Sequence, residues 1–372
     1  MKNVEEIFSE NLKKRRRHLK ITQKALAYKL GYSEKAISKW ESGKCMPPAS
    51  ILPKLANILA TDIDSLLYEE AEIAYYLGID GGGTKTEFLL CDSNKNTVSR
   101  IVLGACNPND IGFDNTLELL RQGISQVCGD IPRRLISVFA GVAGILTGDY
   151  LKLLGAFLEK QHFGKVACGS DAYCAVAASL GHSDGITVIM GTGSIAFAQT
   201  DGKLKRVGGY GYLLGDGGSG FAIARDGISA SLAYEDGSGS YTCIYDALKK
   251  ELNVKELLPN VSKFYTGGKR YIAALASLVF DACDKGDEIA LNIIKSNMRS
   301  IFTIVEGAVK ALHNKENVSV MLCGGLTNRQ DILLPPLKEA LASSSIKYTV
   351  GVCKKSMVEG ALLLAGLEDK NA

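Results

Sequence analysis

Two segments of this chain, about a hundred residues apart, share one arrangement: an apolar run, a glycine-rich turn and a second apolar run. The first reads YYLGIDGGGTKTEFLLCD at residues 75–92 and the second GITVIMGTGSIAFAQT at residues 185–200. The flanking runs are typical of strands, so each turn is predicted to close a β-hairpin. A dinucleotide fingerprint or a P-loop would need a helix directly after the glycines, and both are excluded. The repetition predicts a duplicated lobe with a nucleotide between the halves.

The glycines of the first turn predict a phosphate site. Without a Cβ, backbone N–H groups can approach phosphate oxygens closely, and Asp80 can face a hard cation such as Mg²⁺ through water. An ordinary glycine-rich hairpin remains the alternative. The residues predicted to contact phosphate here are Gly81, Gly82, Gly83, Thr84 and Lys85.

Two further glycine sites support the same interpretation. Gly191 and Gly193 form the second turn, and Gly324 and Gly325 follow the apolar run VMLC, where an adenosine could lie against bare backbone. Together with the first turn, these sites resemble the actin-like ATPase superfold shared by actin and many sugar kinases.

Within that superfold, residues 74–368 resemble the BadF/BadG/BcrA/BcrD ATPase family, specifically its N-acetylglucosamine and glucosamine kinase branch. The motifs that carry the resemblance are GIDGGGTKT (78–86), NPN (107–109), GVAG (141–144), SDA (170–172), GTGS (191–194) and GGYGYLLGDGGSG (208–220). The resemblance implies an α/β two-lobed, ribonuclease H-like domain that phosphorylates an amino sugar with ATP and Mg²⁺. The expected lobes are residues 74–184, joined by a C-terminal helix at 356–368, and residues 185–355.

The same resemblance assigns roles in the site. Asp171 would be the base that takes the sugar hydroxyl proton, and Thr192 would approach the phosphates. Asp171 also begins an apparent helix, so a helix cap is its alternative role, and Asn107 and Asp216 could be plain turn residues. The residues expected around the sugar are Asn107, Asp171, Gly209, Tyr210 and Asp216.

One departure from the family pattern bears on activity. Relatives usually have G-D-E-G-S where this chain has G-D-G-G-S at 215–219, so Gly217 stands in place of an acidic residue. Tyr210 also stands where Trp is frequent. Both changes put the catalytic rate or the sugar preference in question.

The first 54 residues differ in charge from the rest. They hold thirteen Lys and Arg against five Glu, although the whole chain carries only +3. Apolar spacing predicts a helix over residues 4–19 and two short helices separated by Gly31 and Tyr32, with Thr22 and Ser33 as N-caps. Residues 4–68 resemble the XRE-type (Cro/repressor) helix-turn-helix domain through T-Q-x-x-L-A-x-x-L-G-x-S-x-x-x-I-S-x-W-E-x-G.

This resemblance implies a contact surface for double-stranded DNA. Gln23 would grip phosphate, and the exposed face of the later helix would read bases. Domains of this kind usually read two half-sites, so a homodimer on an operator is expected. The base-reading residues are Ser33, Glu34, Lys35, Ser38 and Lys39, and the expected core is Leu26, Ala27, Leu30, Ile37 and Trp40. The basic module is expected to occupy residues 1–68, followed by an acidic linker at 69–73.

Composition limits the remaining possibilities. The sequence contains no run of 18 apolar residues and no apolar signal core at its start, so a cytoplasmic protein is expected. Its ten cysteines are scattered without a C-x-x-C pair and are interpreted as reduced core thiols. Three functions remain open: a DNA-binding regulator fused to an amino-sugar kinase, a sugar or ATP sensor without turnover, and a dehydratase activator ATPase, which would need a cysteine-held iron–sulfur cluster.

Overall fold

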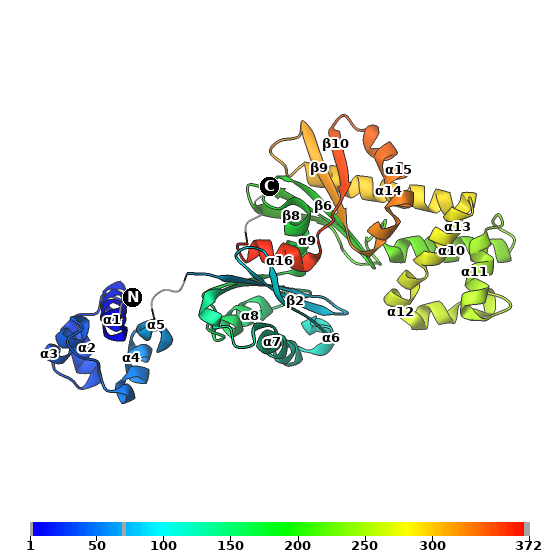
Figure 1. Ribbon diagram of the computed structural model, residues 1–372. Helices are drawn as coiled ribbons and strands as arrows, with labels where there is room; N and C mark the ends of the chain where they lie inside the picture. Colours follow the sequence, from blue (N-terminus) through cyan, green and yellow to red (C-terminus); the bar gives the residue numbers. More distant parts are fainter. Residues whose placement is uncertain (1–2, 69–71, 368–372) are drawn as a thin grey trace. The chain divides into compact units, whose positions relative to one another are not determined.

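The computed structural model describes residues 3–68 and 72–367, and the chain divides into two compact units, Met1–Ala74 and Tyr75–Ala372 (Figure 1). Residues 69–71 of the predicted linker and residue 368 of the predicted final helix lie outside the described residues.

The first unit is helical throughout. Its elements are α1 (Val4–His18), α2 (Gln23–Leu30), α3 (Glu34–Glu41), the 3₁₀ turn η1 (Ala49–Ile51), α4 (Leu52–Ile58) and α5 (Asp64–Leu67). The hydroxyls of Thr22 and Ser33 accept hydrogen bonds from the Ala25 and Ala36 N–H groups, as expected for N-caps. Gly31 ends α2 with φ 76°, which glycine adopts without strain. The predicted helix-turn-helix arrangement is confirmed.

The core of this unit is the predicted one. All five residues expected in it are buried, and Trp40, the single tryptophan of the chain, is only 3% exposed. They pack with Phe8 and Leu12 of α1 and with apolar residues of α4 and α5. The ends of the predicted apolar stripe on the first helix, Val4 and Leu19, lie instead at the surface.

The second unit contains two five-stranded sheets. The first has the order β3-β2-β1-β4-β5, in which β1 pairs antiparallel with β2 and parallel with β4. Its strands are β1 (Tyr75–Gly81), β2 (Thr86–Asp92), β3 (Thr97–Leu103), β4 (Ile136–Val142) and β5 (Lys165–Gly169).

The second sheet repeats this plan. Its order is β10-β9-β6-β7-β8, so β6 pairs antiparallel with the next strand along the chain and parallel with β9. Its strands are β6 (Gly185–Met190), β7 (Ser194–Thr200), β8 (Lys203–Gly208), β9 (Asn317–Cys323) and β10 (Lys347–Val352). Both predicted hairpins are present, and the matching strand orders agree with a duplicated lobe.

Helices cover the faces of both sheets (Figure 1). In the first sheet, α7 packs on β2 and β3, and α8 packs on β5. The helix α16 packs on β1, and α9 contacts strands of both sheets. Gly78 and Gly360 permit the close approach of α16, because a Cβ would lie 2.6 Å from the Val358 oxygen and 2.0 Å from the Cys174 oxygen, respectively. The helices of the first sheet are α6 (Pro108–Ile111), α7 (Phe113–Cys128), α8 (Tyr150–Glu159), α9 (Asp171–Leu180) and α16 (Met357–Leu364), with η2 (Arg133–Leu135).

The remaining helices follow β8. In the second sheet, α14 packs on β6, β7 and β8 and α15 on β10. They are α10 (Gly220–Glu235), α11 (Cys243–Leu252), α12 (Ser262–Ala274), α13 (Ala276–Asp284), α14 (Glu288–Val309) and α15 (Gln330–Ala342), with η3 (Leu258–Asn260) and η4 (Gly325–Arg329). None of the helices within residues 3–68 and 72–367 is long and apolar enough to cross a bilayer.

Candidate active site

The first glycine turn is a four-residue connection between β1 and β2. The Gly82 N–H donates to the Lys85 carbonyl at 2.9 Å and closes the turn. Gly81 is closely packed, since a Cβ there would lie 3.3 Å from both the Cβ and the Sγ of Cys106. Thr84 is exposed, whereas Thr86 is buried and its hydroxyl donates to the Gly104 carbonyl. Thr86 is therefore not directed toward a ligand.

Two carboxylates come together beside this turn, at the carboxyl ends of parallel strands. Asp80 is the second-last residue of β1 and lies opposite Gly141 of β4, and Asp171 follows β5 after Ser170. Burial, with smaller contributions from the negative charges of Asp171 and Glu87, raises the pKa of Asp80 to about 7. The Asp171 carboxylate accepts hydrogen bonds from the Ser170 hydroxyl at 2.8 Å and from the Ala172 N–H at 3.0 Å. The N-cap of α9 is Ser170, so Asp171 is the first residue of the helix.

The Asp80 carboxylate suits a cation. Among the described residues it makes no hydrogen bond or ion pair, and its raised pKa reflects the cost of ionising a half-buried group without such a partner. The described part of the chain has no cluster of three or more His, Cys, Asp or Glu that could hold a metal. A Mg²⁺ ion bound here would therefore keep most of its water ligands, in line with the expectation that Asp80 faces the cation through water.

Asn107 lies in a polar cluster next to the first turn. Its Oδ1 accepts from the Asn109 N–H at 3.0 Å and its Nδ2 donates to Asp110 at 3.1 Å. Gly144 packs directly on this side chain, because a Cβ there would lie 2.2 Å from Asn107 Oδ1. The Cys106 N–H donates to the Gly82 carbonyl at 2.9 Å, which ties the segment to the turn.

The second turn, at 191–193, lies at a junction of three segments. The Gly220 N–H at the start of α10 donates to the Gly191 carbonyl at 2.8 Å. Gly324 has φ 98° and lies against the end of β6, where a Cβ would be 2.4 Å from the Met190 oxygen. Thr192 and Gly325 are exposed, and no atom lies within 4 Å of a Cβ built at Gly191 or Gly325. The second and third predicted glycine sites are thus neighbours.

Asp216 lies beside the second glycine turn. It is buried and has φ 61°, an uncommon conformation for a residue with a side chain. Its carboxylate pairs with Lys269 at 2.9 Å. The loop that carries Asp216 is held by buried Asn297, whose Oδ1 accepts from the Gly218 N–H at 2.9 Å.

The packing around Gly217 explains why a glycine stands at this position. A Cβ built there would lie 2.7 Å from the Cβ of Ser300 on α14, so a glutamate could enter only if that helix or the loop moved. The Gly217 carbonyl also accepts a hydrogen bond from the Ser194 hydroxyl at 2.7 Å. The departure from the family pattern is therefore built into the packing of this loop.

Gly209 and Tyr210 lie before the same loop. Gly209 has φ 69° and packs on Ile195, and its carbonyl accepts from Arg206. The Tyr210 ring is 66% exposed, with the Arg206 guanidinium 5.9 Å from its centroid. Tyr210 is therefore accessible to a ligand.

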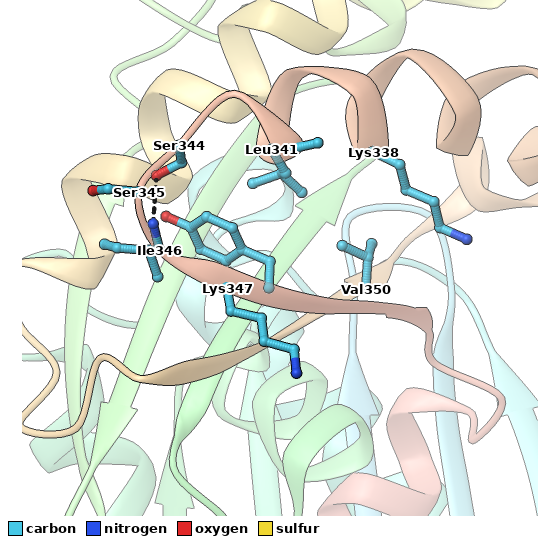
Figure 2. Close-up of a pocket in the computed structure, with 9 residues that line it drawn as sticks. Lys338, Leu341, Ser344, Ser345, Ile346, Lys347 and Val350 are labelled. Atoms are coloured by element: carbon cyan, nitrogen blue, oxygen red, sulfur yellow. Dashed lines mark hydrogen bonds between the residues drawn. The ribbon is translucent and has the colours of Figure 1, made fainter.

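A separate pocket lies between α15 and β10, at the edge of the second sheet (Figure 2). It is lined by the apolar side chains of Leu341 and Val350 and by Lys338 and Lys347. None of the predicted site residues lines it.

The predicted DNA-contacting residues lie on α2 and α3 and at the N-cap of α3, where Ser33 is exposed. Glu34, Lys35, Ser38 and Lys39 are exposed on α3. Gln23 is half-buried, and its side-chain amide donates to Glu41 at 2.7 Å. Glu41 also accepts from Arg16 at 2.9 Å, so Gln23 is oriented by a buried ion pair.

Two residues beside the glycine turns, Lys269 and Arg270, were not predicted from the sequence. Lys269 pairs with Asp216, and Arg270 reaches both Asp110 and the Gly83 carbonyl. They follow Gly267 and Gly268, where α12 is broken, and this Gly-Gly-Lys-Arg segment is the one sequence signal that could have drawn attention to them.

Comparison with known proteins identifies the larger unit. The sequence pattern of the BadF/BadG/BcrA/BcrD ATPase family matches residues 77–365. The chain belongs to this family. The pattern of a helix-turn-helix domain matches residues 9–72.

Individual relatives agree with both assignments. The chain is 28% identical over 309 residues to the N-acetylmuramic acid/N-acetylglucosamine kinase of Clostridium acetobutylicum, covering 79% of this chain and 99% of the relative. Residues of the helical unit are 42% identical over 65 residues to the uncharacterised HTH-type transcriptional regulator YqaE of Bacillus subtilis, covering 18% of this chain and 56% of the relative.

A solved structure supports the fold. It is a protein of Chromobacterium violaceum provisionally named N-acetylglucosamine kinase, with a TM-score of 0.63 and 24% identity, and the match covers 79% of this chain and 99% of that one. The α/β two-lobed, actin-like fold predicted from the sequence is confirmed.

Proposed function

We propose that this protein is a DNA-binding transcriptional regulator whose second unit is an ATP-dependent amino-sugar kinase. The observation that carries the kinase proposal is the pair of matching glycine hairpins, with Asp80 and Asp171 near the carboxyl ends of β1 and β5 and close enough for their charges to interact. Family membership and the kinase name of the relative from Clostridium acetobutylicum support it.

The two carboxylates have surroundings suited to different tasks. Asp171 accepts two hydrogen bonds at the start of α9, and these fix the orientation of its carboxylate. We assign to it the removal of the proton from the attacking sugar hydroxyl as that oxygen bonds to the γ-phosphorus and ADP departs. Asn107 and Asp216 would hold other sugar hydroxyls, since both present oxygen acceptors.

Asp80 is the residue proposed to hold Mg²⁺ through water. When bound, the ion would neutralise charge on the phosphates. The glycine turns at 81–83 and 191–193 would supply backbone N–H groups, and Gly324 and Gly325 a bare surface for adenosine. Phosphoryl transfer needs mainly such positioning and charge stabilisation.

The test is ADP release by the full chain with ATP, Mg²⁺ and one acceptor at a time: N-acetylglucosamine, glucosamine or N-acetylmuramic acid. Turnover with one of these acceptors well above ATP hydrolysis without sugar is expected. An absence of turnover with all three would remove the kinase proposal.

A sensor without turnover is the second candidate, and Gly217 is the observation that favours it. The acidic side chain that relatives usually carry there is missing, and Ser300 fills the space next to the position. Binding of sugar and ATP without ADP release would support this function.

The helical unit is proposed to bind operator DNA as an XRE-type domain. Ser33, Glu34, Lys35, Ser38 and Lys39 would face the major groove, with Gln23 near a phosphate, and a homodimer would read two half-sites. The exposed residues of α3 and the relative named as a transcriptional regulator support this assignment.

A further inference from the structure

Two consecutive cations, Lys269 and Arg270, come from a break in α12. Gly268 has φ 70° and ψ −173°, so the helix stops and restarts there, and its non-helical conformation sets the direction of the two residues that follow. Both cations lie in the single unit Tyr75–Ala372.

Lys269 lies at the second glycine turn. Its Nζ is 2.9 Å from Asp216 Oδ2, and a Cβ built at Gly193 would lie 3.3 Å from the same Nζ. The ammonium group is thus next to the backbone that we propose for phosphate binding.

Arg270 lies at the first glycine turn. Its Nη2 donates to Asp110 Oδ2 at 3.1 Å and approaches the Gly83 carbonyl at 3.4 Å. A Cβ built at Gly83 would lie 3.1 Å from this nitrogen. One dipeptide therefore places a cation against each turn, and any side chain at Gly83 or Gly193 would crowd one of these cations.

The first turn carries one lysine, Lys85, and the second turn, at 191–193, carries none. A P-loop has a lysine within its glycine motif that reaches the β- and γ-phosphates, but Lys85, the lysine of the first turn, is paired with Glu87 at 3.2 Å. A polyphosphate held by two turns carries more negative charge than one lysine neutralises, and transition-state charge in phosphoryl transfer is commonly met by Arg or Lys.

We propose that Lys269 and Arg270 bind the phosphates of ATP, Lys269 at the turn 191–193 and Arg270 at the turn 81–85. Both cations exchange their carboxylate partners, Asp216 and Asp110, for phosphate oxygens. This inference rests on the proposed kinase function and adds to it a pair of phosphate-binding residues. The exchange also frees Asp216 to accept a sugar hydroxyl once ATP is bound.

The test is calorimetric titration of the full chain with AMP, ADP and a non-hydrolysable ATP analogue in the presence of Mg²⁺. Lys269→Met and Arg270→Met should each weaken binding of the ATP analogue by about ten- to a hundredfold, as expected for a lost charge-assisted hydrogen bond, and leave AMP binding unchanged. Lys263→Met, on the exposed part of the same helix, is the matched control and should bind like the wild type.

Folding defects can be separated from lost contacts. The Arg270 side chain is 68% exposed, so losing its ion pair should cost little stability. Lys269→Met leaves buried Asp216 unpaired, and the double variant Lys269→Met/Asp216→Asn removes that uncompensated charge. The double variant should still bind the ATP analogue weakly.

The outcomes distinguish this inference from the kinase proposal. Wild-type protein that binds the ATP analogue, with Lys269→Met and Arg270→Met binding it equally well, would overturn the inference alone. Equal losses of affinity for AMP and the ATP analogue would also overturn it. The variants would then disturb a contact that AMP also makes, and not a contact to the phosphates that AMP lacks. Wild-type protein that binds no nucleotide would overturn both proposals.

Discussion

At the residue scale, the two aspartates beside the first glycine turn differ in their hydrogen bonds. Asp80 and Asp171 are both half-buried carboxylates beside the first glycine turn, but only Asp171 accepts hydrogen bonds. Asp80 is therefore the carboxylate whose ionised form a bound cation would stabilise.

Replacement of Asp171 by Asn tests its role as the base. The variant keeps the size and polarity of the side chain but cannot take the hydroxyl proton, so kcat should fall by about two to four orders of magnitude with sugar and ATP binding kept. Steady-state kinetics together with calorimetric binding would measure this.

Ser170→Ala is the comparison variant, since Ser170 is the N-cap of α9 and its hydroxyl donates to the Asp171 carboxylate. It should lower stability by about 1 kcal/mol and lower kcat less than Asp171→Asn does, because the carboxylate itself remains. If Asp171→Asn changed only the unfolding temperature, with normal specific activity, Asp171 would have a structural role alone.

Gly217 provides a second prediction at this scale. Gly217→Glu restores the usual family residue, but its Cβ would lie 2.7 Å from the Cβ of Ser300. We expect a loss of about 1–3 kcal/mol in the free energy of unfolding, typical of overpacking. Adding Ser300→Gly should relieve part of this loss despite glycine's cost of about 1 kcal/mol within a helix. Chemical denaturation followed by circular dichroism would measure this loss. A single variant as stable as the wild type would contradict the prediction.

At the element scale, the sequence predicts strands and helices well where a local signal defines them. Strand, turn and strand at 75–92 and 185–200 follow from apolar runs around glycines, and α2 and α3 follow from Thr22 and Ser33 as caps. Each signal lies within a few residues of the element that it defines, so no tertiary information is needed.

Contacts between distant elements could not be predicted in this way. Lys269 meets Asp216 across 53 positions, and Arg270 meets Gly83 across 187. Both contacts depend on the break at Gly268, where the chain leaves the helical conformation. The crowding of Gly217 by Ser300 depends in the same way on the packing of α14 against the loop.

The packing of α1, α2 and α3 around Glu41 yields a pH prediction. Burial alone would raise the pKa of the Glu41 carboxyl, but hydrogen bonds from Arg16 and Gln23 outweigh burial and hold it below its ordinary value. A lowered pKa in the folded state means that the contribution to stability is present above the unfolded pKa and is lost as the pH falls through the folded one. The helical unit should therefore lose stability below about pH 4.3, the ordinary value for Glu.

Trp40 makes this prediction measurable in the full chain. It is the single tryptophan and is buried in the helical unit, so its fluorescence reports the unfolding of that unit. Glu41→Gln should lower the unfolding temperature at neutral pH and reduce its decline between pH 6 and pH 3. A variant with the same pH profile as the wild type would exclude Glu41 as the titrating group.

At the scale of the whole molecule, a helix-turn-helix unit and a unit of the BadF/BadG/BcrA/BcrD ATPase family share one chain. A ligand of the second unit can change DNA binding only if it binds one state of the protein better than another. Typical couplings between sites are about 1–3 kcal/mol, or roughly five- to 150-fold in affinity. Half-site spacing is fixed by DNA geometry, so a dimer would be sensitive to any change in the separation of its reading helices.

The most direct test of this account is a titration of promoter DNA from the protein's own locus at fixed salt, with and without N-acetylglucosamine and ATP. The account predicts an affinity change of about five- to 150-fold in either direction, and DNA binding that weakens steeply with salt because of phosphate contacts. The Asp171→Asn variant should show the same change, since ligand binding and not turnover would carry the coupling. Identical DNA affinities under all ligand conditions would contradict the claim that the two units act together.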